Sequence, residues 1–116
     1  MSSDRSRLTP ESAERLEKEA FARLGGLVRR ARPGAALDPL VVAREAGLPL
    51  GQTLALLQAL SHQGQGRLEL RVVDRAGREV GRYANIRDVP ASITDRFGER
   101  TRIYPEQVEL VFRVSS

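Results

Sequence analysis

The stretch from residue 38 to residue 73, DPLVVAREAGLPLGQTLALLQALSHQGQGRLELRVV, decides the fold that the rest of the chain must complete. Asp38 is a favourable helix N-cap, and the proline after it suits the first helical position, so a short helix begins here. Gly47 allows the left-handed backbone that ends a helix, and the Leu-Pro step after it requires an extended residue. The pattern predicts two short helices joined by a tight turn.

The spacing of leucines predicts the second helix, and an alternating pattern predicts the strand that follows it. Leucines on one side of this helix recur every three or four residues: Leu50, Leu54, Leu57 and Leu60. Such a stripe can be buried against a core. After the glycines at positions 64 and 66, Leu68, Leu70 and Val72 alternate with charged residues, which is the period of a half-buried strand.

Two local patterns within this stretch match a known arrangement. From Val42 to Leu48 the residues read hydrophobic–Ala–x–x–Ala–Gly–Leu, and from Leu57 to Gly64 they read Leu–x–x–Leu–x–x–x–Gly before the strand. Over about residues 38–86 the chain resembles the winged helix-turn-helix superfamily. The resemblance implies a helix-turn-helix followed by a wing. Most of that family binds DNA through the second helix, whereas many of its members are protein-interaction modules.

The flanking segments are expected to complete this arrangement. A threonine cap and a proline at position 10 begin a long amphipathic helix, and the alternation near the C-terminus predicts a last strand that pairs with the wing. We expect an α+β fold, a winged helix-turn-helix with three helices packed on a three-stranded antiparallel sheet. The expected parts are a disordered tail at 1–8 and a single domain at 9–116, which comprises an N-terminal helix at 9–31, the helix-turn-helix at 38–63, a wing hairpin at 67–86, a loop with one helical turn at 91–95, and a strand at 107–115.

The matched helix and strand periods predict one shared core. Its expected members are Val42, Ala46, Leu48, Leu54, Leu57, Leu60, Leu68, Leu70, Val72, Leu110 and Phe112. A chain of this length can bury a single core of this modest size.

The composition argues against catalytic and metal-dependent functions. The chain has 116 residues, no cysteine and one histidine, so it offers neither a thiolate site nor a His-rich metal centre. The sequence carries no motif for a nucleophilic serine, a phosphate-binding loop or a zinc protease. We expect no enzymatic activity, no cofactor and no metal. No apolar run approaches the ~20 residues that cross a bilayer, so a cytoplasmic location without membrane contact is expected.

The placement of arginine favours a nucleic-acid partner. The net charge is +4, and Arg75 and Arg78 lie at the expected hairpin tip, where a wing can reach phosphates. On helix 49–62, polar side chains can read base edges, since glutamine pairs well with adenine. We expect a small transcription regulator that binds double-stranded DNA. The expected contact residues for DNA, or for a partner in its place, are Gln52, Thr53, Leu56, Gln58, Arg75, Arg78 and Arg82.

Other features of the same segment favour a protein partner. Residues 35–66 hold one arginine against two carboxylates, so the helix-turn-helix carries a net charge of −1. No arginine or lysine lies on helix 49–62, although arginine makes the commonest specific contact with guanine. Leu50 and Leu56 lie among small residues, which suits a protein groove. The alternative function is therefore a winged-helix interaction or adaptor module that does not bind DNA.

The N-terminal helix has more apolar surface than one packing contact needs. Phe21 lies beside Gly25 and Gly26, where two backbones could approach closely. We expect a homodimer with a two-fold contact made by Phe21, Leu24 and Val28. The alternative is that Phe21 folds back onto the sheet of its own chain.

Overall fold

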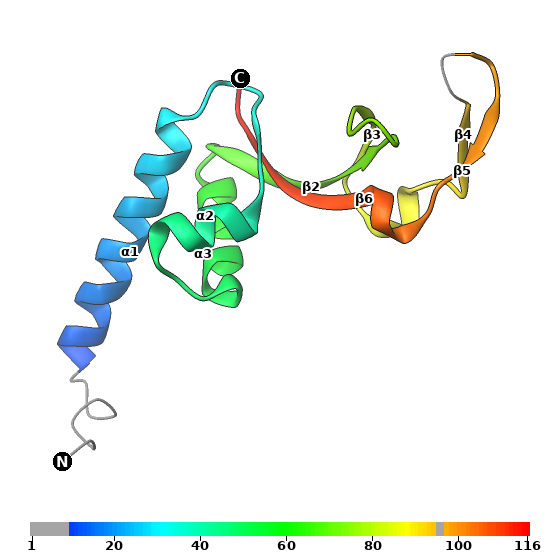
Figure 1. The fold of residues 1–116 in the computed structure, drawn as a ribbon. Coiled ribbons are helices and arrows are strands. Elements are labelled where there is room, and N and C mark those ends of the chain that lie inside the picture. Colours follow the sequence, from blue (N-terminus) through cyan, green and yellow to red (C-terminus); the bar gives the residue numbers. More distant parts are fainter. Residues whose placement is uncertain (1–9, 95–96) are drawn as a thin grey trace.

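The computed structural model describes residues 10–94 and 97–116, so the tail expected at 1–8 lies outside the described residues. Three helices gather at one end of an elongated molecule that measures 63 × 32 × 23 Å (Figure 1). They are α1 (Pro10–Arg30), α2 (Pro39–Ala46) and α3 (Leu50–His62). The fold is α+β, and the three helices lie close to their predicted bounds.

The residues that were predicted to begin and end α2 do so in the structure. Asp38 caps the helix, because its Oδ1 accepts a hydrogen bond of 2.9 Å from the backbone N–H of Leu40. Gly47 ends it in the left-handed region, with φ at 69°. Within the described residues no single helix is long and apolar enough to span a membrane, although α2 and α3 together pass that test across a 105° bend.

The main sheet has four antiparallel strands in the order β1–β6–β2–β3, so the prediction of three strands was wrong. Its strands are β1 (Ala36–Leu37), β2 (Gly66–Val73), β3 (Glu79–Tyr83) and β6 (Val108–Val114). β6 pairs with β2 along its whole length, which confirms the predicted pairing of the last strand with the wing. The extra strand, β1, has only two residues, too few to show any alternation in the sequence.

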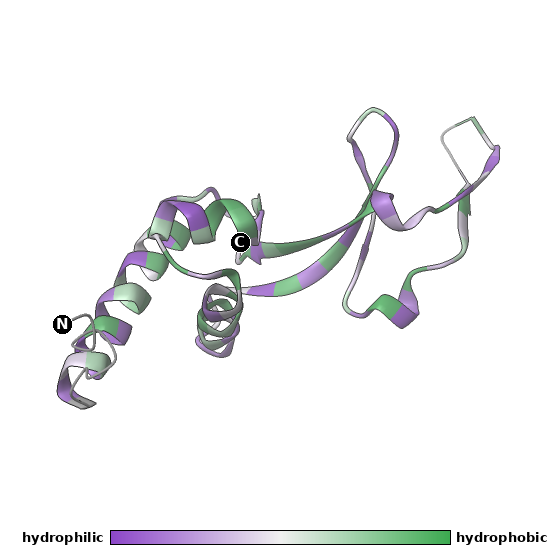
Figure 2. Cartoon of the chain, turned by 60° about the horizontal axis from the view of Figure 1, so that its bottom comes forward, coloured by the Kyte–Doolittle hydropathy of each residue, from purple (hydrophilic) through white to green (hydrophobic). Residues whose placement is uncertain are grey.

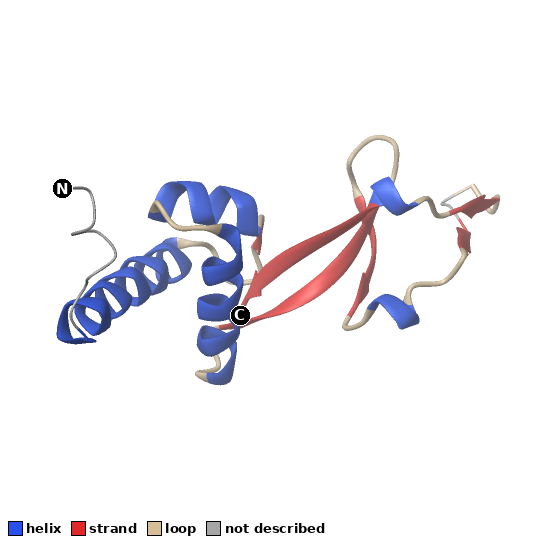
Figure 3. Ribbon diagram, turned by 90° about the horizontal axis from the view of Figure 1, so that it is seen from below, coloured by secondary structure: helices blue, strands red, loops and turns tan. Residues whose placement is uncertain are grey.

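The segment between β3 and β6 forms a second, smaller ribbon rather than a loop. β4 (Ser92–Thr94) pairs with β5 (Arg100–Arg102), and short 3₁₀ turns occupy Ile86–Asp88 and Pro105–Gln107. The helical turn expected at 91–95 was therefore wrong, since strand residues occupy 92–94 and residue 95 lies outside the described residues. Seen from below, the paired strands leave the helices and carry this ribbon to the far end (Figure 3).

The core lies between the three helices and the near end of the sheet. Leu24, Leu57 and Phe112 are fully buried there. Hydrophilic and hydrophobic residues alternate along β2, so one face of the sheet is apolar and turns toward the helices (Figure 2). Gly66 has no room for a side chain, because the Phe112 ring lies against it.

Seven of the eleven residues predicted for one shared core are in it, and four are not. The buried members are Val42, Ala46, Leu57, Leu60 and Phe112, and Leu48 and Leu68 pack against them. Val72 is buried and Leu54 and Leu70 are partly buried, but none of the three belongs to this cluster, so their assignment to the shared core was wrong. Leu110 remains 42% exposed, so its assignment to the core was wrong.

The contact predicted for a homodimer is inside the molecule. Leu24 and Val28 are 0% and 1% exposed within the core of their own chain, so their assignment to a dimer surface was wrong. Phe21 is partly buried and packs against the same core. α2 and α3 both pack against α1, which accounts for the apolar residues Leu24 and Val28, so the homodimer stays a prediction without these two contacts.

Candidate functional site

The turn between α2 and α3 has the geometry of a helix-turn-helix. Three residues separate the helices, which meet at 105°. The backbone N–H groups of Gly47 and Leu48 donate hydrogen bonds of 3.3 and 2.9 Å to Arg44 and Ala43, and these bonds close the end of α2. DNA-binding helix-turn-helix units join their helices at about 90–120° through a turn of three or four residues.

The orientation of α3 removes one predicted contact residue. Thr53 is 0% exposed, and its hydroxyl donates a hydrogen bond of 2.9 Å to the carbonyl oxygen of Pro49. The prediction that Thr53 reads DNA was therefore wrong. The buried stripe runs through Thr53, Leu57 and Leu60, so the helix is rotated from the orientation that the leucine spacing suggested. This rotation leaves Leu50 40% exposed.

Three other predicted residues of α3 have different environments. Gln52 and Gln58 are exposed and reach solvent. Leu56 is partly buried and packs against the core, so it belongs to the structure of the domain rather than to a free surface. The exposed neighbours Gly51 and Ala55 are small and uncharged, which leaves this face of α3 flat.

The tip of the β2–β3 hairpin presents two of the predicted arginines. The Asp74 carboxylate accepts hydrogen bonds of 2.9 Å from the N–H groups of Ala76 and Arg78, and Gly77 takes a φ of 80°. This arrangement matches a three-residue hairpin loop with glycine in the left-handed position. Arg75 and Arg78 are exposed on this loop.

Arg82, the third predicted wing arginine, belongs to an ion-pair cluster around a buried carboxylate. Glu69 is 4% exposed, and its Oε1 accepts hydrogen bonds of 2.7 Å from Arg113 and 3.0 Å from Arg82. Arg67 lies 3.3 Å from the other carboxylate oxygen. Arg113 also pairs with Glu79. Arg82 already compensates a buried charge, but its side chain is 46% exposed, so its contact with DNA stays a prediction.

The Glu69 cluster lies on the face of the sheet that turns away from the helices. Glu69 and Arg82 alternate along their strands with the residues that face the core, such as Leu68. Burial raises the pKa of the Glu69 carboxyl, but the hydrogen bonds from Arg113 and Arg82 outweigh burial and hold this pKa below its ordinary value of 4.5.

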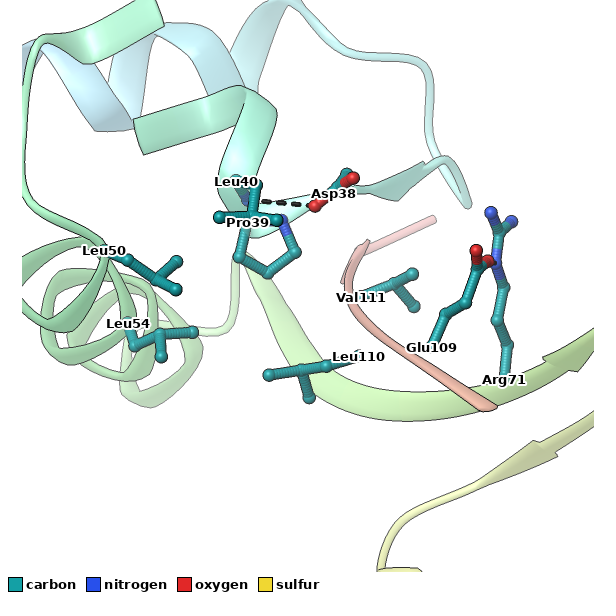
Figure 4. A pocket seen from close by; sticks show the side chains of 9 residues that line it. All are labelled: Asp38, Pro39, Leu40, Leu50, Leu54, Arg71, Glu109, Leu110 and Val111. Atoms are coloured by element: carbon teal, nitrogen blue, oxygen red, sulfur yellow. Dashed lines mark hydrogen bonds and ion pairs between the residues drawn. The ribbon is translucent and has the colours of Figure 1, made fainter. Parts of the chain in front are cut away.

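An apolar groove that the sequence did not predict lies between α2, α3 and β6. It encloses about 350 Å³, and Figure 4 shows the side chains around it. Its lining residues are Asp38, Pro39, Leu40, Leu50, Leu54, Arg71, Glu109, Leu110 and Val111. Leu40, Leu50 and Leu110 are each at least 40% exposed, so apolar surface stays in contact with water here.

Within residues 10–94 and 97–116, no three His, Cys, Asp or Glu side chains form a group that could hold a metal ion. No family model, curated protein or solved structure matches the chain.

Proposed function

We propose that the chain is a small DNA-binding protein of the winged-helix type, a transcription regulator that places α3 in the major groove. The observation that carries this proposal is the angle of 105° between α2 and α3 across a three-residue turn. In such units the second helix enters the major groove while the first crosses the backbone. Two further features of α3 and the hairpin support the proposal.

The exposed face of α3 suits close contact with base edges. Gln52 and Gln58 supply amide groups, which pair in bidentate fashion with the N6 and N7 atoms of adenine. The neighbouring residues Gly51 and Ala55 add no bulk or charge, so the helix backbone can approach the floor of the groove. Discrimination by this set favours adenine over guanine, because no arginine lies on α3.

The hairpin tip supplies the positive charge that α3 lacks. β2 begins next to the end of α3 and runs for eight residues. Arg75 and Arg78 therefore lie roughly 25 Å from the end of α3. Both arginines are exposed there. In the proposed complex they contact phosphates that flank the bases read by α3, and these contacts add affinity without sequence preference.

The salt dependence of binding tests the role of the hairpin tip. Replacing Arg75 and Arg78 together with alanine should reduce the slope of log K against log salt concentration by about two units, one for each phosphate contact. The measurement is a fluorescence-anisotropy titration of duplexes selected from a random pool, at two or more salt concentrations.

A matched double variant, Arg15→Ala/Lys18→Ala, removes the same charge from an exposed part of α1 and serves as the control. Its salt slope should equal that of the wild type. If the hairpin variant also kept the wild-type affinity and slope, the hairpin tip would have no part in binding.

A further inference from the structure

One edge of β6 has no strand partner from Val108 to Val111. β1 covers only Phe112 and Arg113, and then the chain turns away into α2. From Val108 to Val111, β6 pairs with β2 on its other side, and none of the described residues pairs with the open edge. An open edge is a template on which another extended chain can pair.

The alternation of β6 tells which backbone groups face this open edge. The N–H of Val114 donates to Ala35 and its carbonyl accepts from Gly34, both at 2.9 Å, so Val114 turns its backbone toward the β1 side. Every second residue of an antiparallel strand points the same way. Leu110 therefore directs its N–H and carbonyl toward the open edge, where no backbone partner meets them among the described residues.

The apolar groove lies against the same edge. The Leu110 side chain points toward Leu50, Leu54 and Pro39, and these four residues surround a hollow with room for one large apolar side chain (Figure 4). A residue paired opposite Leu110 would project its own side chain on the Leu110 side of the sheet, into this hollow. The open edge and the groove are thus two parts of one site.

The charges around the groove select for a basic partner. Asp38 and Glu109 contribute two carboxylates against the single guanidinium of Arg71, so the lining carries a net charge of −1. Glu109 pairs with Arg71 at 2.8 Å but remains 45% exposed. Residues of a partner strand on either side of the apolar one would project on the face that carries Glu109.

We propose that this edge binds an extended peptide that adds to β6 in the line of β1, antiparallel to β6. The peptide places an apolar side chain opposite Leu110, in the groove, and basic side chains at its two neighbours. The Leu110 backbone provides two hydrogen bonds, as β-strand addition requires, and the groove provides selectivity for the apolar residue. This interaction is separate from DNA binding and does not depend on it.

The test uses the five-residue peptide Arg-Leu-Arg-Thr-Thr with fluorescein at its C-terminal end, so that no peptide residue lies opposite Phe112 or Arg113, which β1 already covers. We expect saturable binding to the full chain with Kd below about 1 mM in anisotropy titrations. N-methylation of the leucine removes its hydrogen bond to Leu110 and should weaken binding at least about tenfold. Replacing both arginines with glutamate should weaken binding to a similar extent.

Two variants of the protein locate the site. Leu50→Glu puts a charge into the groove, yet an acid suits the first turn of α3, so the fold should persist; binding should weaken at least about tenfold. Leu16→Glu makes the same change at another exposed leucine, 51% exposed on α1, and should leave Kd unchanged.

Several results would overturn the proposal. These are the absence of saturable binding, equal binding of the N-methylated or glutamate-flanked peptide, and equal effects of the two leucine variants. Sedimentation equilibrium at about 100 μM, which is far above the Kd of most stable dimers, could give one more result that overturns the proposal. A dimer that Leu50→Glu dissolves would assign the edge to a second copy of this chain instead. Because no DNA is present, none of these results tests the placement of α3 in the major groove.

Discussion

Replacing Glu69 with alanine should lower the free energy of unfolding by about 3–5 kcal/mol, since removing one partner of a buried ion pair leaves charge uncompensated. Glu69 is 4% exposed, and the Arg113 side chain, at 13%, is nearly as well covered. Without the carboxylate, Arg113 and Arg82 would face each other across the sheet. Equilibrium unfolding in urea at neutral pH measures the loss.

The matched control is Glu109→Ala, which breaks an ion pair of the same type at the surface. Glu109 pairs with Arg71 at 2.8 Å, but the two side chains are 45% and 30% exposed. Exposed pairs contribute about 0–1 kcal/mol. Equal losses for the two variants would show that Glu69 contributes no more than a surface charge.

The same carboxylate gives stability a defined dependence on pH. The folded-state pKa of Glu69 lies below its ordinary value of 4.5, so its stabilising effect is fully present above pH 4.5 and is lost as the pH falls through the folded-state pKa. The Glu69→Gln variant keeps the shape but cannot titrate. Its unfolding free energy should therefore fall less steeply than that of the wild type over this acidic range.

Truncating Leu57 to alanine should cost about 2–5 kcal/mol, the usual range for a buried leucine that leaves a cavity. Leu57 is 0% exposed and lies in the core with Leu24, Leu60 and Phe112, which hold the helices on the sheet. The melting temperature and the urea midpoint should both fall, with little change in the urea m-value.

Leu16→Ala is the control for this prediction, because Leu16 is 51% exposed on α1. A surface change of this kind usually alters stability by less than about 0.5 kcal/mol. An unchanged melting temperature for Leu57→Ala would contradict the position assigned to α3 in the core.

Local signals predicted the helices and the longest strands well. The N-cap at Asp38 and the left-handed glycine at position 47 act within a few residues of themselves, so the sequence determines them directly. The same holds for the alternation of β2 and β6, which have eight and seven residues. A strand of two residues, such as β1, forms only because β6 is already in place.

The rotation of α3 could not be predicted from its leucines. Apolar residues at positions 50, 54, 56, 57 and 60 span an arc of about 160° at 100° per residue, and Thr53 lies inside this arc, so the sequence does not say which part of the arc is buried. Tertiary packing buries the face that carries Thr53. The Thr53 hydroxyl donates its hydrogen bond to the Pro49 carbonyl oxygen, one helical turn earlier. The error moved Thr53 from the candidate site into the core and Leu50 from the core to the surface.

Long-range pairing accounts for two further features that local patterns did not predict. Alternation along β2 puts Glu69 on the face opposite the core, and Arg113, 44 residues later in the chain, covers it there. Leu110 continues the apolar face of β6 beyond the part that the helices cover, so the same period that buries Phe112 leaves Leu110 exposed. Both outcomes depend on contacts between segments distant in the sequence, which periodicity does not report.

The most direct test of the proposed function asks whether α3 reads base edges in the major groove. A duplex selected from a random pool is compared with the same duplex carrying 7-deaza-adenine, which lacks the N7 acceptor, at each adenine in turn. The wild type should lose about 1–3 kcal/mol of binding free energy at one or two positions, and Gln52→Ala/Gln58→Ala should show no such loss. Wild-type binding that is unchanged at every position, or a failure to prefer any duplex, would contradict the placement of α3 in the major groove.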